Sequence, residues 1–142
     1  IYESYFAKSE HIYIKNHNLN DKDYFQKISE SSILLLASNF DKNSIDYYRY
    51  SWPAKMGSYL MSKVPILIYG PDKIFFINDA IKKKWAYVES EKSLIKLEES
   101  LKKILYNSNL RKQTLKYALK KSKDFELKEI QKKLVNLLKS AL

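Results

Sequence analysis

Apolar residues along the chain fall into short runs and longer periodic stretches that alternate with one another. Four short runs predict strands, either because β-branched and aromatic residues are frequent in them or because they are apolar throughout. They are HIYIK (11–15), SILLLA (32–37), VPILIY (64–69) and WAYVE (85–89). The second and third runs are apolar almost throughout, which is typical of strands covered on both faces.

Apolar residues spaced three and four apart predict helices between and after these runs. Asn20 is placed to cap a first helix, Pro53 suits the first position of a second, and residues 72–83 predict a third, with Lys82 to Lys84 suited to its C-terminus. After residue 90 the spacing predicts three consecutive helices, the second capped by Asn107 or Ser108. The periodic positions of the first of these helices are Leu94, Leu97, Leu101 and Ile104. Those of the second are Leu110, Thr114, Tyr117 and Lys121, and those of the third are Leu127, Ile130, Leu134, Leu137 and Ala141.

The order of these elements predicts an α/β fold with a mostly parallel sheet and helices on both faces, ending in three consecutive helices. The 142 residues fit a single domain, 1–142. Because the chain begins with Ile rather than Met, we expect a fragment of a longer protein.

Composition removes several function classes. Without Cys there is no disulfide framework, thiolate metal site or Cys nucleophile, and His11 and His17 alone argue against a His-based metal centre. No apolar stretch approaches the ~18 residues of a membrane span, and no signal peptide is recognisable. We therefore expect a soluble, cytoplasmic domain.

The formal net charge is +10, and nearly all the basic residues are lysines. Codon bias of an AT-rich genome explains this as well as attraction to an anionic partner does. The most basic segment is 112–133. Its interleaved glutamates favour a solvated face. The second interpretation is that this segment makes peripheral contact with an anionic membrane, at the inner face of that membrane.

The segment YSWPAKMGSYL (50–60) leaves the carboxyl end of the 32–37 strand and opens a helix. Parallel sheets bind ligands in the crevice at this edge, and free amides at a helix N-terminus attract anions. Lys55 and Ser58 are expected to project at the mouth of the crevice. Met56, Tyr59, Leu60 and Lys63 share the face expected to pack on the sheet.

A run of motifs in one order carries a family resemblance. ILLLAS is followed by WPAKMGSYLMSKVPILIYGP, then WAYVES, LIKLEESLKKILYN and SNLRKQTLKYALKKSKDF. This order, over residues 30–140, resembles the C-terminal, donor-binding domain of two-Rossmann-domain (GT-B type) glycosyltransferases of group 1. The positions that match the sequence motif typical of this family are Pro53, Lys55, Tyr59, Leu60 and Pro65.

The resemblance implies a Rossmann-like domain whose helix at Pro53 cradles the diphosphate of a sugar nucleotide, with Lys55 near its charge. The family's two carboxylates fall at Tyr50 and Ser58, so a carboxylate bond to the ribose cannot be transferred, although Ser58 can bind a hydroxyl. The implied donor-binding residues are Tyr50, Pro53, Lys55, Ser58, Tyr59 and Gly70. The resemblance implies that the substrate is a nucleoside-diphosphate sugar and that the reaction uses no cofactor and no metal ion.

The chain also departs from the family pattern at its start. It lacks the first strand-helix unit or units, which carry a Gly-rich turn and an Arg and a Lys that hold the diphosphate. The catalytic base and acceptor site belong to a missing N-terminal domain, so no catalytic residue is assigned here and the isolated chain is expected to be inactive.

The leading hypothesis is therefore the donor-binding half of a bacterial glycosyltransferase, an enzyme that moves a sugar to a hydroxyl acceptor in surface polysaccharide or lipopolysaccharide synthesis. The alternative is a non-catalytic basic α/β module that binds nucleic acid, a membrane surface or a protein. Because no nucleic-acid-binding motif is present, we expect no nucleic acid partner. The aromatic cluster after the second strand suits packing better than stacking on a nucleobase; its members are Tyr47, Tyr48, Tyr50 and Trp52.

Overall fold

A computed structural model describes residues 19–141 of the chain. The predicted strand at 11–15 and both histidines lie outside these residues. Among them, three strands form one parallel sheet in the order β1-β2-β3: β1 (Leu34–Ala37), β2 (Ile66–Tyr69) and β3 (Tyr87–Glu89). The predicted α/β fold with a parallel sheet is confirmed.

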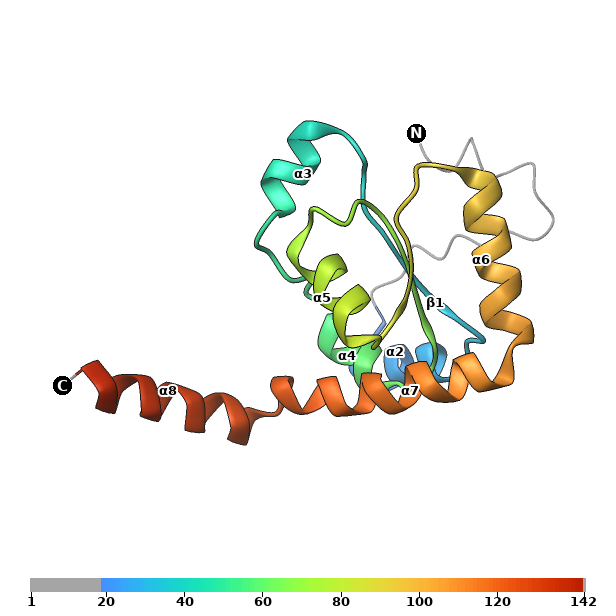
Figure 1. Ribbon diagram of the computed structural model, residues 1–142. Helices are drawn as coiled ribbons and strands as arrows, with labels where there is room; N and C mark the ends of the chain where they lie inside the picture. The colour runs from blue at the N-terminus through green and yellow to red at the C-terminus, as the bar shows by residue number, and fades with distance from the viewer. Residues whose placement is uncertain (1–18, 142) are drawn as a thin grey trace.

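Helices fill the connections and cover both sides of the sheet (Figure 1). In chain order they are α2 (Asp21–Ser29), α3 (Lys42–Tyr48), α4 (Met56–Met61), α5 (Phe75–Lys83), α6 (Leu94–Tyr106), α7 (Ser108–Ser122), the 3-10 turn η1 (Lys123–Phe125) and α8 (Leu127–Ala141). α5 and α6 lie on opposite sides of the sheet. The prediction that the chain ends in three consecutive helices is confirmed by α6, α7 and α8.

Side-chain caps explain where several helices begin. Asn20 accepts a hydrogen bond from the amide of Asp23 at 2.9 Å, and Asn107 accepts one from the amide of Leu110 at 2.9 Å. Each bond satisfies an amide that has no partner within the first turn. Asn107 is therefore the cap of α7, and Ser108 is its first helical residue.

β1 and β2 differ in how far they are covered. Ile66, Leu67 and Ile68 of β2 have no exposed surface, as the apolar run predicts. In β1, by contrast, Leu35 is 47% exposed. The expectation of a strand covered on both faces is right for β2 and wrong for β1, because β1 lies at one edge of the described sheet and β2 at its centre.

The helix predicted to open at Pro53 begins later. Residues Pro53 to Lys55 form a turn closed by a hydrogen bond of 2.9 Å from the amide of Met56 to the carbonyl of Pro53. α4 has only six residues, of which Met56 and Leu60 are buried as expected. The expectation for Lys63 is wrong, because this residue is exposed, follows the helix and has a left-handed backbone with φ of 60°.

The core joins the sheet to α4, α5 and the end of α7 through aromatic side chains. Trp85 is fully buried, and Trp52 stacks on it with ring centroids 6.1 Å apart. Phe125 meets Trp52 edge to face at 5.6 Å. Trp52 therefore packs within the domain, as favoured from the sequence. The same expectation is wrong for Tyr47, Tyr48 and Tyr50, which are all exposed.

α8 differs from every other element because it extends away from the domain (Figure 1). Every residue from 126 to 140 is exposed. Its apolar stripe, predicted from spacing, therefore has no partner among the described residues.

Candidate functional site

The carboxyl edge of the sheet, where the three strands end, has a pocket with aromatic walls. Its volume is about 540 Å³. The end of β1 forms its floor, and α3 together with the following loop forms its sides. The lining residues are Leu36, Ala37, Tyr47, Tyr48, Ser51, Trp52, Pro53, Ala54 and Phe76. The pocket therefore suits a flat, apolar group at the edge where parallel sheets bind ligands.

Two further pockets are formed by segments next to those of the aromatic pocket, and each is lined by at least one basic residue and by one aspartate, Asp41 or Asp72. One, of about 310 Å³, is lined by the loop after β1 and by Lys92. The other, of about 440 Å³, is lined by Arg49, Tyr50 and the loop after β2, including Lys73. Arg49 is already paired with Asp46 at 2.6 Å. Lys73 and Lys92 are thus cations at the carboxyl edge that form no ion pair within the described residues.

The predicted donor-binding residues are distributed among different surroundings. Pro53 lines the aromatic pocket, and Tyr50 lines the neighbouring pocket with 81% of its surface exposed. Lys55 is exposed immediately before α4 and lines none of the pockets described here. Only Pro53 and Tyr50 therefore lie in the pockets of the carboxyl edge.

Ser58 and Tyr59 take part in contacts within the domain. The Ser58 hydroxyl donates to the carbonyl of Lys55 at 2.8 Å and lies 3.0 Å from the hydroxyl of Tyr24. This contact connects α4 to α2. Burial, and to a smaller extent Tyr24, raises the pKa of the partly buried Tyr59.

Gly70 is required by close packing at the end of β2. A Cβ atom there would lie 2.9 Å from Cδ1 of Ile77 and 3.0 Å from Cβ of Ser38. The amide of Gly70 donates to the carbonyl of Glu89 at 3.1 Å. The residue thus lets the loops after β1 and β2 approach each other, which shapes the carboxyl edge.

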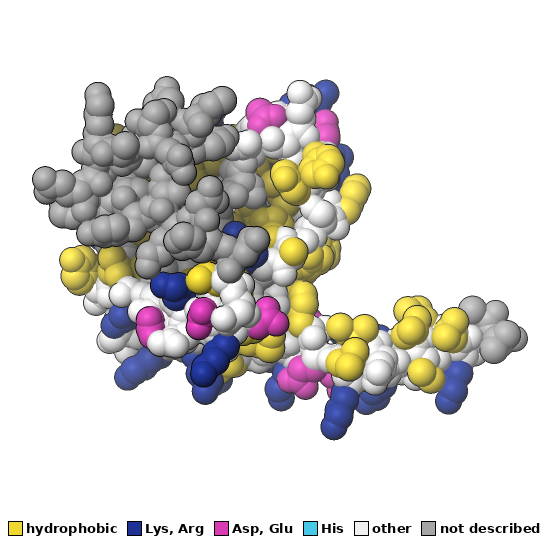
Figure 2. Space-filling view, turned by 180° about the vertical axis from the view of Figure 1, so that it is seen from behind, with side chains coloured by type: hydrophobic (Ala, Val, Ile, Leu, Met, Phe, Trp, Pro, Cys, Tyr) yellow, Lys and Arg dark blue, Asp and Glu magenta, His cyan; other side chains and the backbone are white. Residues whose placement is uncertain are grey.

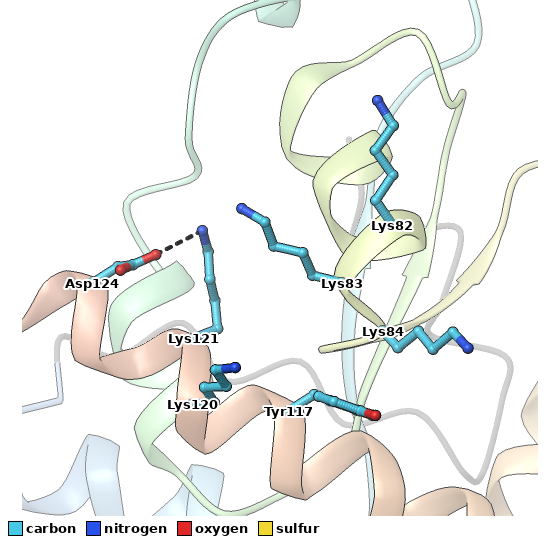
Figure 3. A pocket seen from close by; sticks show the side chains of 7 residues that line it. All are labelled: Lys82, Lys83, Lys84, Tyr117, Lys120, Lys121 and Asp124. Carbon is cyan, nitrogen blue, oxygen red and sulfur yellow. Dashed lines mark hydrogen bonds and ion pairs between the residues drawn. The ribbon is translucent and has the colours of Figure 1, made fainter.

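A separate cavity, of about 500 Å³, lies where α5 ends, before β3 begins, and is lined mainly by lysines (Figure 3). α5 and the residue after it contribute one side, and α7 with η1 contributes the other. The lining residues are Lys82, Lys83, Lys84, Tyr117, Lys120, Lys121 and Asp124. The cavity is at the amino edge of the sheet.

Asp79 organises the inner part of this amino-edge cavity. Its buried carboxylate accepts from Nε1 of Trp85 at 2.8 Å and pairs with Lys83 at 2.5 Å and with Lys121 at 3.2 Å. Lys121 also pairs with Asp124 at 3.0 Å and lies 4.7 Å from the ring centroid of Trp52. Burial alone would raise the pKa of Asp79, but the hydrogen bonds from Lys83, Trp85 and Lys121 outweigh it and lower the pKa.

The remaining lysines of the cavity are different. Lys82, Lys84 and Lys120 are exposed and form no ion pair within residues 19–141. In Figure 3 the side chains of Lys82 and Lys84 point away from each other. They therefore form a basic surface and not a closed cradle for a single anion.

Sequence reasoning did not anticipate this cavity, although two signals for it exist. Lys121 occupies a position of the α7 stripe that otherwise takes apolar residues, which fits its 10% side-chain exposure. Asp79 and Lys83 stand four residues apart on one helix, the spacing of a side-chain pair. Their meeting with Lys121 depends on the packing of α5 beside α7.

Comparison of the chain with family models, with curated proteins and with solved structures finds no match. Within the part of the chain that the structure describes, no three His, Cys, Asp or Glu residues come together in a way that could hold a metal ion. Nor is any helix of that part long and apolar enough to cross a membrane.

Proposed function

We propose that this chain is the donor-binding half of a glycosyltransferase that moves a sugar from a nucleoside-diphosphate sugar to a hydroxyl acceptor. The observation that carries the proposal is the aromatic pocket at the carboxyl end of β1, with a lysine in each of two neighbouring pockets. A nucleobase is flat and apolar on its faces, and a diphosphate is an anion, so the two parts of the donor match two adjoining surfaces. The order of motifs that resembles GT-B enzymes of group 1 supports the same assignment.

In this proposal Tyr47 and Tyr48 stack on the nucleobase. Lys73 and Lys92 line the two neighbouring pockets, where they attract the diphosphate. When the acceptor hydroxyl attacks the anomeric carbon, the bond to the diphosphate breaks and negative charge grows on the leaving group. Nearby ammonium groups stabilise that charge. The short α4 adds little, because a helix of six residues supplies few aligned amides.

The proposed partner is an acceptor-binding domain that supplies the catalytic base. The apolar face of α8 favours such a partner: six large side chains on it are 47 to 69% exposed. They are Leu127, Ile130, Leu134, Val135, Leu137 and Leu138. Figure 2 shows apolar side chains on the upper side of α8 and lysines along its lower edge; the rest of the domain rises on the upper side. A folded domain fits in this angle and covers the apolar face.

The test is a titration of the chain with uridine and guanosine diphosphates at millimolar concentration, followed by amide NMR spectra. We expect shifts in residues 47–54 and around Ala37. Tyr47→Ala is expected to weaken binding about fivefold, since one stacked aromatic ring is worth about 1 kcal/mol.

Tyr106→Ala is the matched control. Tyr106 is exposed to a similar extent as Tyr47, 85% against 79%, but it lies at the end of α6 and does not line the aromatic pocket. Its binding should equal that of the unmodified chain. A spectrum that stays unchanged with both nucleotides, or shifts confined to the amino-edge cavity, would overturn the proposal.

A further inference from the structure

Four lysines form a stripe along the outer side of α7 and its continuation into η1. Lys112, Lys116, Lys120 and Lys123 follow one another at spacings of four, four and three, which places them on one side of a helix. All four are exposed. The opposite side of α7 is anchored to the domain by the buried residues Thr114, Ala118 and Ser122. The orientation of the stripe is therefore determined by packing.

α7 itself has no acid beside the stripe: residues 108–122 include five basic residues and neither Asp nor Glu. Asp124 of η1, which follows Lys123, pairs with Lys121 and Lys133. Within the described residues none of the four stripe lysines forms an ion pair. Like charges four residues apart repel each other and weaken a helix. A face that only needed to be solvated would not require this arrangement.

The basic surface continues beyond the stripe. Lys120 also lines the amino-edge cavity, where Lys82 and Lys84 are exposed beside it (Figure 3). Figure 2 shows basic side chains along the lower edge of the molecule and along the lower side of α8, with some acidic side chains among them. The positive charge is thus concentrated along one edge of the domain, away from the apolar side of α8.

We propose that the lysine stripe of α7 docks on the anionic headgroups of a phospholipid membrane. This inference goes beyond the proposed function and does not depend on it. The long row of point charges on flexible stems is complementary to a surface of many mobile phosphates. Leu119, which is 42% exposed on the same helix, adds an apolar side chain close to the stripe.

Two features of the stripe favour headgroups over nucleic acid. The one arginine of α7, Arg111, whose planar fork could grip a phosphate in two places, is partly buried, whereas the stripe lysines are exposed. The one aromatic residue of α7, Tyr117, on which a base could stack, is also partly buried. The attraction is therefore diffuse and electrostatic, and it should weaken with salt.

The experiment measures co-sedimentation of the full chain with vesicles of phosphatidylcholine, alone or with added phosphatidylglycerol. We expect binding only when the anionic lipid is present, and loss of binding at high salt. Replacing Lys112, Lys116, Lys120 and Lys123 together by Gln is expected to lower the partition coefficient by at least a hundredfold, because each lysine near such a surface contributes about fivefold.

The matched control replaces four other exposed lysines, Lys42, Lys73, Lys92 and Lys96, by Gln. Both variants lose four positive charges, so net charge alone predicts equal effects. We expect the control to retain most of the binding, and both variants to keep the circular dichroism spectrum of the unmodified chain.

Three results would overturn the inference. The first is equal binding of the chain to neutral and anionic vesicles. The second is an equal loss of vesicle binding in the stripe variant and the control variant. The third is tight, stripe-dependent binding of a single-stranded oligonucleotide by a chain that does not bind vesicles. The last result would assign the stripe to nucleic acid. None of these readouts depends on nucleoside diphosphate binding, so the two proposals fail separately.

Discussion

α6 and α7 are neighbours that use the same kind of residue in opposite ways. They meet at Asn107, have 13 and 15 residues, and are both packed against the domain through one side. On α6, Lys96 pairs with Glu99 at 3.0 Å and Lys102 pairs with Glu98 at 2.6 Å. On α7 the exposed lysines have no acid on the helix to meet.

This difference bears on the meaning of the lysine-rich composition. A codon bias toward lysine would act on both helices alike, so it does not account for the absence of acids from one of them. The charges of α6 are largely balanced within the helix, while those of α7 remain available to a partner. The distribution of acids, more than the number of lysines, distinguishes the two surfaces.

The largest expected effect concerns Lys121, the α7 lysine that is paired. Asp79→Asn retains the shape and the acceptor for Trp85 but removes the charge that Lys83 and Lys121 share. Because Lys121 is nearly buried, we expect a loss of about 2 to 3 kcal/mol in the free energy of unfolding. Urea denaturation measures it. Asp72→Asn, in an exposed loop, should change stability by less than about 0.5 kcal/mol.

The same pair predicts a pH dependence. The lowered pKa of Asp79 means that the carboxylate stabilises the fold at every pH above its unfolded value of about 4. This contribution decreases as the pH falls below that value and is lost once the pH passes the lowered folded pKa. Asp79→Asn should therefore show a smaller loss of stability on acidification than the unmodified chain, and equal slopes would contradict the assignment.

A second change gives α7 the charge pattern of α6. Asn109→Glu and Gln113→Glu place acids three residues before Lys112 and Lys116, within reach of a side-chain pair. We expect the double variant to gain about 0.5 to 1 kcal/mol in stability, since each pair is worth a few tenths, while vesicle binding falls about tenfold or more. Asn109→Gln with Gln113→Asn is the neutral control. Unchanged vesicle binding would show that the stripe does not contact the membrane.

The smallest effect is expected from the reverse change on α6. Glu98→Gln with Glu99→Gln removes both ion pairs, and we expect a loss of about 0.5 kcal/mol, because exposed pairs contribute little. Melting curves at low and high salt measure it, and the difference from the unmodified chain should shrink with salt. A loss above about 2 kcal/mol would mean that the exposed ion pairs of α6 do more than balance charge on its surface.

Much of the fold could be predicted from local patterns. The buried run of β2 and the cap Asn20 depend on neighbours in sequence and were correctly predicted, and Asn107 was one of the two caps predicted for α7. The opening of α4 was not, because the sequence between β1 and β2 contains an additional helix, α3, which the Tyr-rich segment does not signal. Ser58 was expected at a ligand site, yet its hydroxyl lies beside Tyr24 on α2, a contact between distant segments.

The candidate sites show the same limit. Spacing alone placed Pro53 near the carboxyl edge and Lys121 on the inner stripe of α7. It could not reveal that the aromatic walls of α3 face Pro53, or that Lys121 would meet Asp79.

By itself, the sequence determined the alternation of strands and helices, the buried centre of the sheet and the lack of acids on α7, since these follow from residue types at short spacing. Only the tertiary structure decided that the lysines at the end of α5 adjoin the stripe of α7, that Trp52 closes the core, and that α8 leaves its apolar face uncovered. Each of these features depends on which segments far apart in the chain pack together and which do not. That packing also determines which charges are paired and which remain free for a partner.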